Sequence, residues 1–70
     1  MPTHFRVTMV GGMQLEVDDH EVAIVRATAQ ASLKGEATPL ISIMIRDADG
    51  ATTEGPTINV LQVVSIEPID

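Results

Sequence analysis

One short segment, residues 47–54, is rich in side chains whose oxygen atoms could bind a metal ion or take part in catalysis. Asp47, Asp49, Thr53 and Glu54 all lie there, and carboxylate and hydroxyl oxygens are the donors that Ca²⁺ and Mg²⁺ prefer. A calcium-binding EF-hand would also need an acidic residue two positions before Asp47, where this chain has Ile45, and a glutamate well downstream in a helix. Weak binding of a cation or small ligand by the 47–54 loop therefore stays open as an alternative function.

The same segment has a second interpretation, because an apolar strand runs into Asp47-Ala48-Asp49-Gly50. This pattern resembles the nucleophile loop of the haloacid-dehalogenase phosphatases, and the resemblance implies Asp47 as nucleophile, Asp49 as general acid and magnesium between them. The family pattern has threonine directly after the glycine, where this chain has Ala51. Seventy residues also cannot build the large domain that supplies the remaining ligands. We therefore interpret the segment as a β-turn and expect no catalytic residue, cofactor or metal.

The two histidines, His4 and His20, are the other candidates for acid–base chemistry. A histidine base needs a nucleophile and an orienting partner that converge on one pocket. The sequence offers neither, so we expect both to be surface residues and the protein not to be an enzyme.

Charge and composition restrict the partners. Ten acidic residues against four basic ones give a formal charge of -6, which repels a polyanion, and Phe5 is the one aromatic available to stack on bases. No run approaches the roughly 18 apolar residues of a membrane span, and the first residues lack the order of a signal peptide. We expect a cytoplasmic protein that binds neither nucleic acid nor membranes.

The first eighteen residues predict a β-hairpin. Apolar residues alternate on both sides of Gly11-Gly12. A three-residue loop, Val10-Gly11-Gly12, pairs Met9 with Met13 and makes one face of the hairpin wholly apolar, whereas a two-residue loop would mix apolar and polar residues on each face. We favour the three-residue loop, which also sets Arg6 opposite Glu16 and His4 opposite Asp18.

A helix is predicted from Asp19 to Leu33. Asp18 and Glu21 have capping-box spacing, and Gly35 provides a stop. One stripe, Val22, Val25, Ala29 and Leu33, should pack on the apolar face of the hairpin. A second stripe, on the opposite side of the helix, consists of Ile24, Ala27 and Ala31.

The C-terminal half predicts two further strands. Leu40 to Arg46 alternates, Asp49-Gly50 indicates a turn, and Gly55-Pro56 should close a polar loop with an optional short strand at 51–54. The alternation resumes at Ile58, breaks at Leu61 with a bulge or short turn, and ends in a last strand that contains Val64 and Ile66 and stops at Pro68.

Together these patterns predict one α+β domain over residues 1–70. Its strands follow the order strand, strand, helix, strand, strand, and form a small antiparallel sheet with one helix packed on one face. The other face of the sheet would carry Leu40, Met44, Leu61 and Val63, which is more apolar than a solvated surface requires. A chain of this size without cysteine also depends on very good packing or on a partner.

We therefore expect a small acidic interaction or adaptor module, an accessory protein of phage or mobile-element type, that self-associates as a dimer and can bind another protein. The interface candidates are the second helix stripe and the apolar sheet face: Ile24, Ala27, Ala31, Leu40, Met44, Leu61 and Val63. One further alternative is a nucleic-acid-binding barrel, since residues 58–67, Ile58-Asn59-Val60-Leu61-Gln62-Val63-Val64-Ser65-Ile66-Glu67, resemble the closing segment of small SH3-like or Sm-like barrels.

Overall fold

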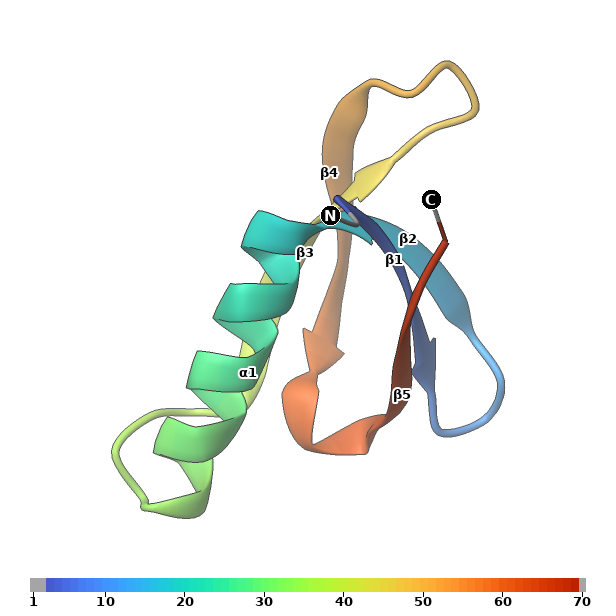
Figure 1. Cartoon of the computed structure of the whole chain (residues 1–70). Helices are drawn as coiled ribbons and strands as arrows, with labels where there is room; N and C mark the ends of the chain where they lie inside the picture. The colour runs from blue at the N-terminus through green and yellow to red at the C-terminus, as the bar shows by residue number, and fades with distance from the viewer. Residues whose placement is uncertain (1–2, 70) are drawn as a thin grey trace.

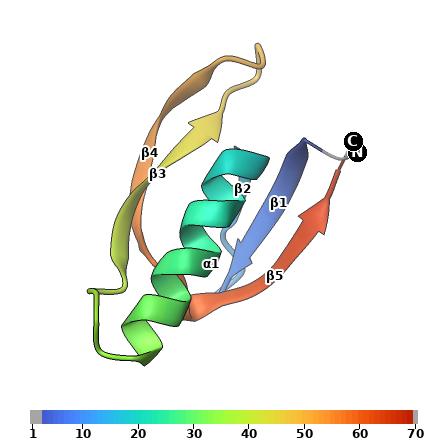
Figure 2. The ribbon, with the colours of Figure 1, turned by 60° about the vertical axis from the view of Figure 1, so that its left-hand side comes forward.

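The computed structural model describes residues 3–69, and its fold is α+β with small antiparallel sheets and one α-helix, as predicted. Figure 1 shows the order of the elements. They are β1 (His4–Met9), β2 (Gln14–Asp18), α1 (Asp19–Leu33), β3 (Leu40–Arg46), β4 (Thr52–Asn59), the 3-10 helix η1 (Val60–Gln62) and β5 (Val63–Pro68). The strands divide into two sheets, β2-β1-β5 and β3-β4, and Figure 2 shows α1 in front of the space between them.

The β1–β2 hairpin has the predicted register. Phe5 lies opposite Val17, Arg6 opposite Glu16 and Val7 opposite Leu15. The backbone N–H of Met9 donates to the carbonyl of Met13 at 2.8 Å, which closes the three-residue loop. Gly12 has a φ of +96°, in the left-handed region that the last position of such a loop requires.

Helix α1 begins and ends where the sequence predicts. After Lys34, the N–H of Gly35 donates to the carbonyl of Ser32 at 3.0 Å and that of Glu36 donates to Ala31 at 2.8 Å. These are the two hydrogen bonds of a Schellman motif, and Gly35 takes its left-handed φ of +76°. The predicted cap at the other end is wrong, because the side chain of Asp18 makes no capping hydrogen bond.

Strand β4 continues through residues that the sequence analysis assigned to a loop. Gly55-Pro56 lies inside the strand, and the optional strand at 51–54 largely forms its first half. The pairing slips by one residue between Ser42 and Met44, so Gly55 and Pro56 together face the single residue Ile43. Proline is tolerated at such a bulge because it needs no ladder N–H. Glycine is required because a Cβ at Gly55 would lie 2.8 Å from the Ile43 carbonyl oxygen.

A second bulge lies where β5 begins. Met9 pairs with Val63 and Thr8 pairs with Ser65, so Val64 is the extra residue. The predicted orientation of these valines is therefore wrong. Val63 packs against the hydrophobic core, and Val64 is exposed. An inserted residue reverses the alternation of side chains before it, which the periodicity of the sequence does not reveal.

The core draws on both sheets and the helix. Val7, Val17 and Ile43 are completely buried, and they meet further apolar residues from the hairpin, the helix, β4 and η1: Met9, Leu15, Val22, Val25, Ile58 and Val60. The predicted helix stripe is right at Val22 and Val25 but wrong at Leu33, which is 77% exposed. Figures 1 and 2 both show the last turn of α1 extending beyond the ends of the strands.

Candidate functional site

The acidic segment considered for chemistry forms a turn between β3 and β4. One carboxylate oxygen of Asp47 accepts the backbone N–H groups of Asp49 at 2.9 Å and Ala51 at 3.0 Å. The N–H of Gly50 closes the turn on the Asp47 carbonyl at 3.0 Å. The Asp47 side chain thus orders the turn, as an aspartate at this position commonly does.

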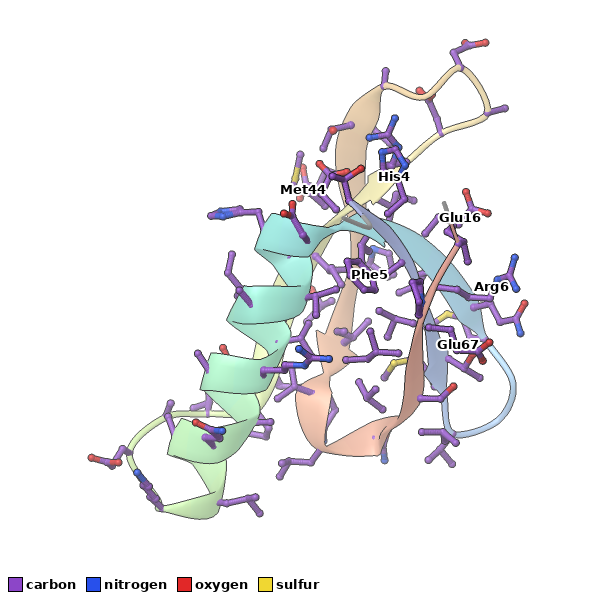
Figure 3. The ribbon with its side chains drawn as sticks, in the orientation of Figure 1. His4, Phe5, Arg6, Glu16, Met44 and Glu67 are labelled. Carbon is purple, nitrogen blue, oxygen red and sulfur yellow. The ribbon has the colours of Figure 1, made fainter. Side chains whose placement is uncertain are left out.

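Two acidic residues at the start of α1 reach across to β3 instead of capping the helix. Oδ1 of Asp18 accepts a hydrogen bond from the Arg46 guanidinium at 2.9 Å. Oε1 of Glu21 accepts the backbone N–H of Met44 at 2.8 Å. Glu21 is the one charged residue of the described chain that is buried, and Figure 3 places Met44 beside the first turn of the helix. These contacts hold the β3–β4 sheet against the rest of the fold.

The seven predicted interface residues separate into three places. Val63 is partly buried and packs against the core. Ile24 and Met44 are each 38% exposed, and Ala27 and Ala31 lie further along α1, exposed and half-buried respectively. Leu40 and Leu61 lie at the opposite end of the molecule from the β3–β4 turn. The predicted single apolar face does not exist, because its residues are divided between two sheets and η1.

The largest collection of exposed apolar side chains includes Leu40 and Leu61. Nine large hydrophobic residues stay exposed in residues 3–69, and six of them come from three segments at one end of the molecule. Figure 1 shows these segments at the bottom: the β1–β2 loop, the end of α1 with the following loop, and η1 with the start of β5. We name this surface the apolar end and define it by Val10, Met13, Leu33, Leu40, Leu61 and Val64.

Backbone hydrogen bonds fix these segments relative to one another. The N–H of Val10 donates to the carbonyl of Gln62 at 2.8 Å, which joins the β1–β2 loop to η1. The N–H of Val60 donates to the carbonyl of Pro39 at 2.8 Å, which joins η1 to the residue before β3. Asn59 accepts the N–H of Leu61 with its side chain at 2.9 Å, so the turn that presents Leu61 is also ordered. The segments that build the apolar end therefore hold fixed positions relative to one another.

Charge is distributed unevenly between the two ends. Residues 10–13, 33–40 and 60–64, which build the apolar end, contain one basic residue, Lys34, and one acidic residue, Glu36. The other described carboxylates lie elsewhere. Two lie on the outer side of the three-stranded sheet, where Arg6 is in register with both Glu16 and Glu67 (Figure 3). The remaining six lie at the start of α1 and around the β3–β4 turn: Asp18, Asp19, Glu21, Asp47, Asp49 and Glu54.

Sequence reasoning misses four members of the apolar end. Val10 lies in the predicted loop, and Met13 lies on the hairpin face that the helix is expected to cover. Leu33 belongs to the predicted core stripe, and Val64 lies on the opposite side of its strand from Val63, which the sequence places on the outer face. A valine in a glycine-containing loop was the one available signal, because loops run over the surface. Nothing in the periodicity distinguishes Leu33 from a core residue, since its exposure depends on where the strands end.

Within residues 3–69, neither a pocket nor a metal site adds a second candidate to the apolar end. No pocket is found in the described residues, and none of their His, Asp and Glu side chains form a group of three that could hold a metal ion. The helix within residues 3–69 is too short and too polar to cross a membrane. No family model matches the chain, and no curated protein and no solved structure matches it significantly.

Proposed function

We propose that this chain is a non-enzymatic interaction module and that the apolar end is its protein-binding surface. The observation that carries the proposal is the gathering of Val10, Leu33, Leu61 and three further exposed apolar side chains on one end. Monomeric proteins rarely leave large apolar patches in water, and such patches mark interaction sites.

The free energy gained by burying each apolar side chain is small, so most of the apolar end has to take part in binding. Completely burying a Val, Leu or Met side chain gains about 1.5–3 kcal/mol, so each half-exposed side chain of the apolar end gains roughly 1 kcal/mol when covered. A micromolar complex needs about 8 kcal/mol of net free energy, after the cost of association, so one or two such contacts are insufficient. The six side chains together supply roughly 6 kcal/mol. The partner therefore has to cover all of them and to bury apolar side chains of its own.

The proposal is tested by site-specific photo-crosslinking in the cells that naturally contain the protein. A photoreactive residue at Leu61 should yield a discrete cross-linked species, because the partner covers η1. The matched control is the same residue at Thr53, which is exposed on β4 near the acidic turn and should yield no such species. The Leu61 product should disappear when Leu33→Glu is added. Equal labelling at both positions, or none at Leu61, would show that the apolar end is not a binding surface.

A further inference from the structure

We infer that the occupant of the apolar end is a second copy of this chain, bound end to end across a twofold axis. This inference rests on the proposed function and names its partner. Three observations favour a second copy: the position of the carboxylates, the pair of charges beside Leu33, and the minor share of surface that a dimer needs.

The position of the carboxylates favours contact through this end. Six acidic residues lie at the start of α1 and around the β3–β4 turn, toward the other end of a molecule whose longest extent is 37 Å (Figure 1). Charges on a protein surface are screened over about 8 Å at physiological salt. Two copies that meet at their apolar ends therefore keep these acidic groups many screening lengths apart. A basic partner, by contrast, would be drawn to the acidic end.

The two charged residues at the apolar end have opposite signs, so those of one copy can pair with those of another. Lys34 and Glu36 are exposed on either side of Gly35, directly after Leu33. In a twofold interface, residue i of one copy meets residue j of the other, and the reverse contact forms as well. Lys34 of each copy can thus approach Glu36 of the other, so that one basic and one acidic residue make two opposite-charge pairs at the rim.

A dimer of this chain needs only a minor share of its surface. A stable interface buries about 800 Å² on each partner, and the described chain exposes 4414 Å² in total. Such an interface would use a little under a fifth of the surface.

The test is sedimentation equilibrium of the full chain from micromolar to submillimolar concentration, with circular dichroism as the check on folding. The parent should form a dimer. Lys34→Glu and Glu36→Lys should each raise the dissociation constant about tenfold, since each exchanges two attractive pairs for two repulsive ones. The double variant Lys34→Glu/Glu36→Lys should return to within about threefold of the parent, because it restores both pairs with their signs exchanged.

Three further variants separate this interface from others. Leu33→Glu should raise the dissociation constant by about a hundredfold or more, because it places a charge in the apolar contact, and Val10→Glu should do the same from another segment. Ile24→Glu, in the first half of α1 and not at its end, should change nothing.

A parent that stays monomeric at submillimolar concentration would overturn the inference, as would a double variant that fails to recover. A monomer whose Leu61 position cross-links to a different protein would keep the proposed function and exclude only the second copy. A monomer with no Leu61 product would exclude both.

Discussion

The carboxylate of Glu21 accepts the backbone N–H of Met44 at 2.8 Å. The backbone N–H and C=O groups of residues 43 and 45 point toward β4. Because these groups alternate along a strand, the N–H of Met44 points away from β4, toward α1. No strand pairs with that edge of β3, and the N–H would lack a partner without Glu21. A glutamate in the first turn of the helix thus completes the hydrogen bonding of β3.

Removing this acceptor should destabilise the protein. Glu21→Ala leaves the N–H of Met44 without its acceptor, and we expect a loss of about 1–3 kcal/mol in the free energy of unfolding. Glu21→Gln keeps an oxygen acceptor at the same position and should lose less than the alanine variant. Urea unfolding measures both. Equal losses for the two variants would show that packing of the side chain matters more than its hydrogen bond.

The Asp18–Arg46 ion pair should contribute little. Both side chains are partly exposed, at 34% and 26%, and pairs of this kind contribute about 0.2–1 kcal/mol. A double-mutant cycle of Asp18→Asn and Arg46→Gln should give a coupling energy in that range, which falls when salt is raised to about 1 M. A coupling above about 2 kcal/mol would mean that the pair is shielded from solvent more strongly than its exposure indicates.

The bulge in β4 should depend on Gly55. A methyl group there would approach the Ile43 carbonyl oxygen and the Ile45 side chain, each at 2.8 Å, so Gly55→Ala should cost about 1–3 kcal/mol. Thr53→Ala, an exposed change on the same strand, is the control and should stay within about 0.5 kcal/mol. Thermal unfolding compares them. Equal melting temperatures for Gly55→Ala and the parent would contradict this close approach.

The two neighbouring valines at the start of β5 should respond differently to truncation. Val63 packs against the core and Val64 is 64% exposed. Val63→Ala should therefore lower the free energy of unfolding by roughly 1–2 kcal/mol, and Val64→Ala by less than about 0.5 kcal/mol. Measurement at low micromolar concentration keeps any association from adding to either value. The reverse order would place the bulge at a different residue.

Much of the local structure could be predicted from the sequence. The Gly11-Gly12 pair and the alternation of Met9, Val7 and Leu15 determined the hairpin register, because only one loop length puts the apolar residues on one face. The bounds of α1 followed from its alanine-rich composition and from Gly35, whose left-handed conformation ends the helix. Each of these features depends on residues that are close in the chain.

The tertiary structure decided which surfaces the elements use. Asp18 and Glu21 have the spacing of a helix cap, yet both bond to β3, because that strand brings an unpaired N–H and a guanidinium to the helix start. Leu33 continues a core stripe but is exposed, since the last turn of α1 extends beyond the ends of the strands (Figure 1). Periodicity specifies which residues of an element share a side. Contacts between segments far apart in the chain decide which neighbour that side packs against. Those long-range contacts also placed the exposed apolar residues at one end of the molecule.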